Sequence, residues 1–305
     1  MKKRRMKKTL GEKIFIATNC VLLTLVFVIT LYPMIYVVSA SFSDPVSVSS
    51  GKMILWPIAP TLEGYKAIFN YKDIWTGYAN TIFYTVLGTL CNLAATLPCA
   101  YALSRKDLEG KGFVLAIFMF TMYFNGGLIP TYLNYNEFGM INTRAILLVS
   151  GLVSVYNLIV ARTFFANTIP WELQEAAYLD GCSHFKVFTN IVLPLSAPII
   201  VVLTLYYGIT HWNQYFNAMI YLKNRDLFPL QVFLKEILTQ SQLSAEAMLE
   251  GGFTPEEIAE YQAMGETADR MKYGIIVISS LPMMIVYPWL QKFFAKGTMI
   301  GSVKG

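Results

Sequence analysis

The residues of this chain that could do chemistry are few, and several of them lie in one polar stretch between two apolar runs. The stretch Gln174–Pro198, QEAAYLDGCSHFKVFTNIVLPLSAP, holds two carboxylates together with Cys182, His184 and Lys186. The chain has only one other histidine, His211, and neither histidine has a sequence pairing with Cys or Ser that indicates a catalytic nucleophile. The sequence therefore gives no support to a catalytic role for this stretch.

Other sources of chemistry are also missing from the sequence. It has no G-x-x-x-x-G-K-[ST] loop with which to bind ATP phosphates, and its apolar runs lack the array of ionisable residues that an ion-driven carrier needs. Its four cysteines (Cys20, Cys91, Cys99 and Cys182) have no C-x-x-C spacing, so we expect neither a disulfide nor a metal site. We expect a protein that is not an enzyme, binds no cofactor and forms a pathway without its own energy source.

The composition indicates a membrane protein that consists of helices. Of the 305 residues, 55% are hydrophobic and 14% are charged, whereas about a quarter of a soluble domain is charged. Six apolar runs are long enough to cross a bilayer. They are Ile14–Val38, Tyr78–Leu103, Phe113–Leu133, Ala145–Phe165, Ala197–Leu222 and Tyr273–Phe294. The sequence therefore predicts an all-α fold with six transmembrane helices.

The distribution of Lys and Arg predicts that both termini are cytoplasmic. With the N-terminus inside, 15 basic residues lie on the cytoplasmic side and 9 on the outer side. Seven of the 15 are in residues 1–13, where anionic lipid explains them better than nucleic acid does. A cleaved signal peptide is the alternative for the first run, but Ile14–Val38 is longer than the apolar part of such a peptide. We expect a multi-pass protein of the plasma membrane.

This topology divides the chain into a tail, a membrane domain and a second tail. Residues 1–13 and 295–305 are the cytoplasmic tails, and residues 14–294 form the membrane domain. Residues 42–77 and 223–272 are the large outer loops, and residues 166–195 form a cytoplasmic loop.

The second outer loop is acidic, with a net charge of −4. Thr254 to Glu257 has the signature of a helix start, and Gly265 could end that helix. A solvated loop without helix is the alternative. We expect the loop to help seat an extracellular protein, and deletion of residues 245–266 without loss of docking would refute this.

The cytoplasmic loop reads as a short helical elbow. Pro170 predicts a helix start and Gly181 a left-handed helix stop. A second helical segment would place Phe185, Phe188 and either Ile191 or Val192 on one face. An interfacial helix that lies on lipid is the alternative.

The elbow also resembles a known motif. Glu175-Ala176-Ala177, Gly181 and then Ile191-Val192-Leu193-Pro194 match the EAA loop of ABC importer permeases, in the pattern EAA-x3-G-x9-I-x-LP. The resemblance implies the type I ABC importer permease fold and a loop that docks on a separate ATPase subunit. It further implies that Glu175, Ala176, Ala177 and Gly181 make this contact. Ile191, Leu193 and Pro194 would anchor the loop to the fifth span.

Further stretches are similar to one branch of that family. The long loop before the last span and the ending Gln291–Gly297 with Gly301–Gly305 resemble carbohydrate-uptake permeases of the maltose G type. The run Phe124–Pro130 resembles the lipoprotein-linked, complex-oligosaccharide subgroup of Gram-positive bacteria. The resemblance implies as partners a second related permease, two ABC ATPase subunits that bind ATP and Mg²⁺, and an extracellular lipoprotein that binds oligosaccharide.

Aromatic rings and amides in the spans are candidates for contact with a sugar, because sugars stack on rings and hydrogen-bond to amides. In the fifth run, Tyr207, His211 and Gln214 have the spacing of one helical face, and Asn213 and Asn217 that of another. The remaining candidates are Tyr123, Asn125, Tyr156 and Asn157. Interfacial aromatic belts and amide bonds between helices are the structural alternatives.

Three other functions stay open at this point. The chain could be an ABC permease for peptides or another small solute, a secondary carrier independent of ATP, or a membrane scaffold or sensor. The elbow and the scarcity of charge in the spans argue against the carrier. The polar faces of the fifth run would have no purpose in a scaffold.

Overall fold

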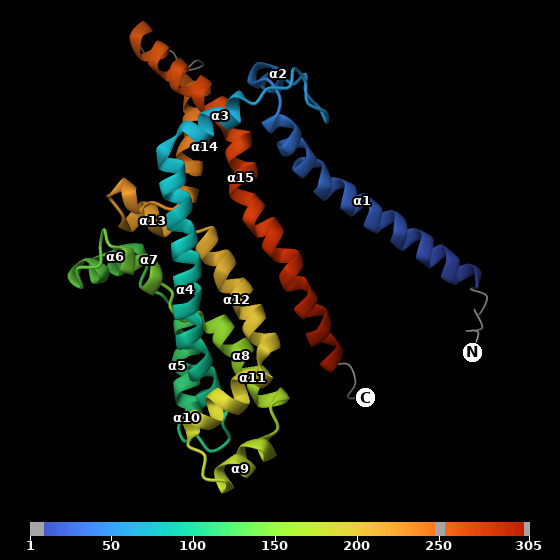
Figure 1. Cartoon of the computed structure of the whole chain (residues 1–305), viewed down its shortest axis with the longest axis vertical. Coiled ribbons are helices and arrows are strands. Elements are labelled where there is room, and N and C mark those ends of the chain that lie inside the picture. The colour runs from blue at the N-terminus through green and yellow to red at the C-terminus, as the bar shows by residue number, and fades with distance from the viewer. Residues whose placement is uncertain (1–8, 248–253, 302–305) are drawn as a thin grey trace. The chain divides into compact units, whose positions relative to one another are not determined.

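The computed structural model describes residues 9–247 and 254–301, and within these ranges every regular element is a helix (Figure 1). In chain order these are α1 (Leu10–Ser41), α2 (Pro45–Ser49), α3 (Glu63–Asn70), α4 (Lys72–Ser104), α5 (Lys111–Tyr123), α6 (Leu128–Glu137), α7 (Arg144–Val149), α8 (Val155–Thr168), α9 (Trp171–Leu179), α10 (His184–Val187), a π-helical turn η1 (Phe188–Val192), α11 (Leu193–Leu195), α12 (Ala197–Trp212), α13 (Phe216–Tyr221), a 3₁₀ turn η2 (Arg225–Leu227), α14 (Leu230–Ala247) and α15 (Pro255–Gly301). The predicted all-helical fold is confirmed for the described residues. The basic residues before Thr9 and the tail after Gly301 lie outside them.

Within the described residues, three helices are long and apolar enough to cross a membrane. They are α1, α4 and the part of α15 from Gln262 to Pro288, and they contain or overlap the first, second and sixth predicted spans. Two bent helix pairs also pass this test when each is taken together. The six-span count and the cytoplasmic placement of both termini stay predictions.

The predicted third, fourth and fifth spans are interrupted, which hydropathy did not reveal. The third bends by 116° between α5 and α6, where Gly127 adopts φ 86°. The fourth is divided between α7 and α8, with Gly151 at φ 77° in the break. The fifth ends as a helix at Trp212 and resumes at Phe216. Glycine at positions 127 and 151 allows these positive φ angles, which other residues rarely adopt.

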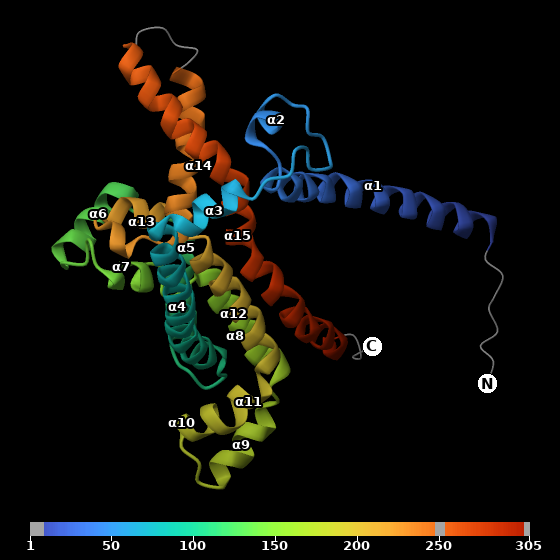
Figure 2. The same cartoon turned by 45° about the horizontal axis from the view of Figure 1, so that its top comes forward.

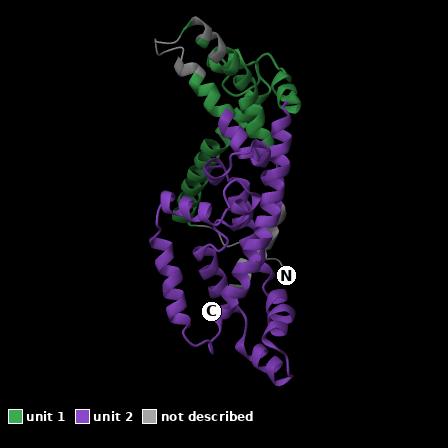
Figure 3. Ribbon diagram, turned by 90° about the vertical axis from the view of Figure 1, so that its left-hand side faces the viewer, with its two compact units in different colours: residues 1–70, 237–278 green, residues 71–236, 279–305 purple. Residues whose placement is uncertain are grey.

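The chain divides into two compact units, which Figure 3 colours separately. The first comprises residues 1–70 and 237–278. In this unit α3 approaches α15 closely at Gly64. A Cβ added there would lie 2.2 Å from the carbonyl oxygen of Arg270, so only glycine fits. Ser241 Oγ on α14 donates to Asp269 Oδ1 on α15 at 2.6 Å.

The predicted helix start in the acidic loop is confirmed. Glu257 N donates to Thr254 Oγ1 at 3.3 Å and Thr254 N donates to Glu257 Oε2 at 2.8 Å, which is a capping box. The predicted stop at Gly265 is wrong, because α15 continues through this residue to Gly301. A single glycine costs a helix only about 1 kcal/mol, so it does not end a helix on its own.

The second unit comprises residues 71–236 and 279–305 and is organised around α4. Helices α8 and α12 pack along it, and α9, α10 and α11 lie together at one end of α4 and α12 in both Figure 1 and Figure 2. The main core of this unit is formed by buried apolar residues of α4, α8, α9, α10, η1 and α12. The elbow is therefore packed into the same core as α4, α8 and α12.

Candidate functional site

The first limb of the elbow, α9, has well-defined ends. Pro170 precedes its first residue, and Glu172 lies in its first turn, where a carboxylate favours the helix dipole. Gly181 adopts φ 78°, its N–H donates to the carbonyl of Tyr178 at 3.0 Å, and Cys182 N–H donates to the carbonyl of Ala177 at 2.9 Å. These two bonds form a Schellman motif, so the predicted left-handed stop is confirmed.

The second limb buries the predicted face except for Phe185. Val187, Phe188 and Val192 are buried in the core, whereas Phe185 is 76% exposed. Phe185 lies in the first turn of α10, where its side chain leans toward the helix start and away from the core. The prediction that Phe185 shares the face of Phe188 is therefore wrong.

The residues of the EAA motif divide into exposed and buried ones. Glu175, Ala176 and Gly181 are exposed, and the Glu175 carboxylate accepts a 2.6 Å hydrogen bond from Trp171 Nε1. Ala177 is only 7% exposed and belongs to the core. Its burial follows from its position on the inward face of α9, and the contact of Ala177 with an ATPase subunit stays a prediction.

The anchoring residues of the motif lie where the elbow meets the next helix. Ile191 and Leu193 pack against the main core, and Pro194 occupies the start of α11 with its side chain exposed. The elbow also presents large apolar side chains outward. Leu179 is 89% exposed and Leu173 is 44% exposed, in addition to Phe185.

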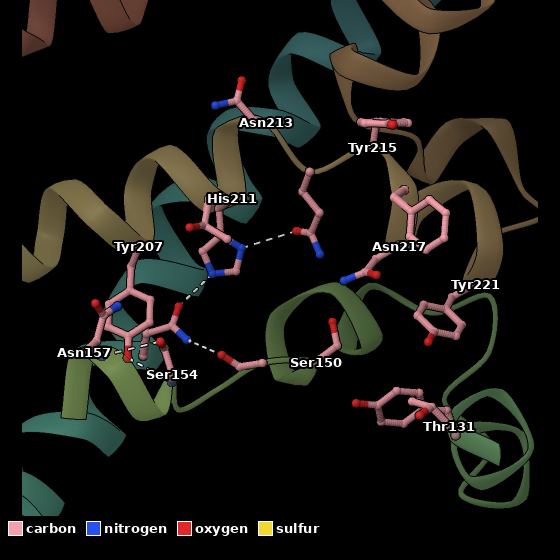
Figure 4. A pocket seen from close by; sticks show the side chains of 16 residues that line it. Thr131, Ser150, Ser154, Asn157, Tyr207, His211, Asn213, Tyr215, Asn217 and Tyr221 are labelled. Atoms are coloured by element: carbon pink, nitrogen blue, oxygen red, sulfur yellow. Dashed lines mark hydrogen bonds between the residues drawn. The ribbon is translucent and has the colours of Figure 1, made fainter. Parts of the chain in front are cut away.

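A cavity of about 570 Å³ lies in the second unit, between α4, α6, α8, α12 and α13 (Figure 4). Its lining is made of amides, hydroxyls and aromatic rings, and the described part of the chain contributes no Lys, Arg, Asp or Glu to it. The lining residues are Asn92, Thr131, Tyr135, Ser150, Gly151, Ser154, Asn157, Tyr207, Thr210, His211, Asn213, Gln214, Tyr215, Phe216, Asn217 and Tyr221.

Most of the predicted pathway residues meet in this cavity. Those that line it are Asn157, Tyr207, His211, Asn213, Gln214 and Asn217. Tyr123 is 73% exposed at the end of α5, and Asn125 Oδ1 accepts from Gly127 N at 2.9 Å in the bend after that helix. Tyr156 is 55% exposed and contacts Tyr206. These last three candidates do not line the cavity.

The prediction that the candidate residues of the fifth run form two faces of one continuous helix is wrong. Gln214 and Asn213 lie beyond the last residue of α12, and Asn217 belongs to α13. All three residues nevertheless line the same cavity. Tyr207 and His211 remain one turn apart on α12 and are both buried.

His211 is held by α4. Asn92 Nδ2 donates to the carbonyl oxygens of Gly151 and Leu152 at 3.1 and 2.7 Å, and this fixes the orientation of the amide. Asn92 Oδ1 lies 2.7 Å from His211 Nε2, so Nε2 carries the hydrogen, and Nδ1 lies 3.3 Å from Gln214 Oε1. A Cβ on Gly88 would lie 2.5 Å from the imidazole, so glycine is needed for this approach.

Tyr207 is held in the cavity wall by two hydrogen bonds. Its hydroxyl lies 2.7 Å from Thr96 Oγ1 and accepts a 3.2 Å hydrogen bond from Ser154 N. Within the described part of the chain, Ser150 Oγ is buried and has no hydrogen-bond partner. A buried hydroxyl without a partner is costly, so Ser150 can donate to a ligand in this cavity.

The family described as binding-protein-dependent transport system inner membrane component matches residues 74–300, which include both the cavity and the elbow. The chain belongs to this family. This permease component is 35% identical over 98% of its length to the protein LplC of Bacillus subtilis (strain 168), and the match covers 98% of that protein.

A second relative and one solved structure are similarly close. The permease component is 37% identical over 91% of its length to the polygalacturonan/rhamnogalacturonan transport system permease protein YtcP of the same organism, and the match covers 93% of that protein. It is also similar to a chain in the crystal structure of a bacterial ABC transporter involved in the import of the acidic polysaccharide alginate. That similarity has a TM-score of 0.82 and 33% identity, and it covers 95% of this chain and 99% of the other. The predicted type I permease fold is confirmed at the level of the family.

The sequence prediction missed several cavity residues of the permease component. Asn92, Thr131, Ser150 and Ser154 line the cavity but were not among the candidates. Asn92 could have been found, because it is an amide in the middle of an apolar run, where a polar group needs a partner. Thr131 and Ser154 carry no such signal, since they lie near the ends of their helices.

Replacing Asn92 with Leu is expected to destabilise the permease component by about 1–3 kcal/mol, because the carbonyls of Gly151 and Leu152 lose their donor. The measurement is the melting temperature of the solubilised transporter complex. Asn213→Leu is the matched control, because Asn213 is exposed and, among the described residues, its side-chain amide donates only to the Ile209 carbonyl one turn earlier. Equal melting of the Asn92 variant and wild type would contradict the role given to Asn92.

Proposed function

We propose that this chain is the permease subunit of an ATP-driven, binding-protein-dependent importer of oligosaccharides. The observation that carries the proposal is the cavity, whose uncharged lining of amides, hydroxyls and rings matches the hydroxyls and apolar faces of a sugar. The relatives add support, since one is named for polygalacturonan and rhamnogalacturonan transport and another belongs to an alginate importer.

The proposed assembly contains four kinds of subunit. The chain pairs with a second related permease, two ABC ATPase subunits dock on the cytoplasmic side, and an extracellular solute-binding lipoprotein delivers the sugar. The chain itself binds no cofactor, and ATP with Mg²⁺ binds to the ATPase subunits. The proposed location is the plasma membrane of a Gram-positive bacterium, with six spans and both termini in the cytoplasm.

The elbow is the proposed contact with the ATPases. Glu175, Ala176 and Gly181 are exposed there, next to the exposed side chains of Leu179 and Phe185. An exposed apolar surface of this kind is typical of a docking site for another protein. Closure of the ATPases on ATP would move the elbow, and the elbow is packed into the core that holds α4, α8 and α12.

The substrate is tested by a screen of ATP hydrolysis in the reconstituted complex. Neutral oligosaccharides, uronic-acid oligosaccharides and peptides are each added together with the cognate binding protein. We expect at least one class of oligosaccharide to stimulate ATP hydrolysis and peptides to have no effect. Stimulation by peptides without any response to saccharides would assign the chain to a different solute class.

A further inference from the structure

A second connection between the elbow and the cavity lies at the end of α4, where Arg105 follows the last helical residue. The Arg105 side chain is only 11% exposed, although a guanidinium is permanently charged. Its Nε donates to Asp107 Oδ1 at 2.9 Å. Its Nη1 donates to the Tyr101 hydroxyl oxygen at 3.2 Å and also to the Tyr178 hydroxyl oxygen. The residue therefore joins α4 to α9.

Aromatic rings of α9 enclose the same guanidinium. Its central carbon lies 5.4 Å from the ring centre of Trp171 and 5.2 Å from that of Tyr178. Such cation–π contacts stabilise the guanidinium more strongly as water is excluded from it. Asp107 completes the surroundings, and its hydrogen bond with Arg105 holds the pKa of the Asp107 carboxyl below its ordinary value. The ion pair is therefore intact at neutral pH.

Tyr101, one turn earlier on α4, makes the connection to both limbs of the elbow. Its hydroxyl donates to Gln174 Oε1 at 2.9 Å, and both side chains are buried. Its ring stacks on Phe188 with 5.1 Å between the ring centres. His184 joins the two limbs to each other, because its Nδ1 lies 2.9 Å from the Tyr178 hydroxyl.

Helix α4 carries this connection directly to the cavity. Gly88 and Asn92, which hold His211, lie on the same helix as Tyr101. At 1.5 Å per residue, the 13 residues from Asn92 to Arg105 correspond to about 20 Å along the axis. A helix with packed contacts at both ends can carry coupling energy between two sites.

We propose that Arg105 is a positioning residue that transmits movement of the elbow to α4, and through α4 to the cavity. This route is separate from the covalent one, in which the elbow continues through α11 into α12. The proposal rests on the proposed function, because it needs an ATPase that moves the elbow. A lysine cannot replace Arg105 fully, since it lacks the planar fork that binds a carboxylate while stacking on rings.

The test is the number of oligosaccharide molecules imported per ATP hydrolysed in proteoliposomes that contain the complete transporter. We expect Arg105→Ala to lower this ratio at least about five-fold, the lower end of typical coupling between sites, and Arg105→Lys to give an intermediate value. Lys106→Ala is the matched control and should leave the ratio unchanged, because Lys106 is the adjacent basic residue and is exposed.

The outcomes separate positioning from a purely structural role. An Arg105→Ala complex that assembles in smaller amounts but imports as much per ATP as wild type would overturn the proposal.

If Arg105→Ala does not assemble, Tyr178→Phe is the variant that tests the proposal. It removes only the hydroxyl that contacts Arg105 and His184 and should lower the ratio about two-fold or more. An unchanged ratio there would also overturn the proposal. A wild-type complex that imports no oligosaccharide would refute the proposed function itself.

Discussion

Replacing Leu179 with Asp is expected to abolish ATP-dependent import, with a loss of about 100-fold or more. Leu179 is the most exposed large apolar residue of the elbow, at 89%, and it lies between the exposed Ala176 and the left-handed Gly181. An apolar anchor at the centre of an interface contributes about 2–4 kcal/mol to binding, and an unpaired carboxylate placed there adds a desolvation cost. Both effects oppose docking of the ATPase.

Two measurements check this prediction: the amount of ATPase that co-purifies with the permease, and oligosaccharide uptake by vesicles. Both should fall together in Leu179→Asp. Leu179→Met is the matched control, because it keeps the volume and the apolar character, and it should retain most of the uptake. Wild-type uptake by the Asp variant would show that the exposed apolar surface of the elbow is not the docking site.

The second large effect is expected from filling the cavity. Asn217 lies on α13, is half-buried, and lines the cavity together with Tyr221 (Figure 4). An indole at this position occupies space that a sugar needs, so Asn217→Trp should lower oligosaccharide import at least about ten-fold. ATP hydrolysis stimulated by the binding protein should persist, because the elbow is unchanged.

Met219→Trp provides the matched control for the cavity experiment. Met219 lies on the same short helix, is 51% exposed, and does not line the cavity. Import by this variant should stay close to that of wild type. Equal import by the Asn217 and Met219 variants would indicate that the sugar does not pass through this cavity.

Local signals made the elbow predictable from the sequence. The signals that begin and end α9 lie within or next to the helix: a proline before it, an acidic residue in its first turn and a glycine after its end. The left-handed stop predicted at Gly181 is present as a Schellman motif. The inward position of Ala177 was not predictable in this way. It depends on which face of α9 meets α4 and α8, and that is decided by tertiary packing.

The cavity could be predicted only in part, for the same reason. His211 and Tyr207 were found because they lie one turn apart in a continuous helix. Gln214 and Asn217 were found for the wrong reason, since the helix that was expected to align them ends at Trp212. The position of Asn92 in an apolar run marks it as a candidate, but its acceptors could not be predicted, because the carbonyls of Gly151 and Leu152 are free only where the predicted fourth span is broken.

The most direct test of the whole account is uptake of labelled oligosaccharide by proteoliposomes that contain both permeases and the ATPases, with the binding protein added outside. If ATPases that dock on the elbow drive import, we expect uptake with ATP, no uptake with a non-hydrolysable ATP analogue, and no uptake by Leu179→Asp. Uptake that continues without the ATPase subunits, or that is the same with the analogue as with ATP, would contradict it.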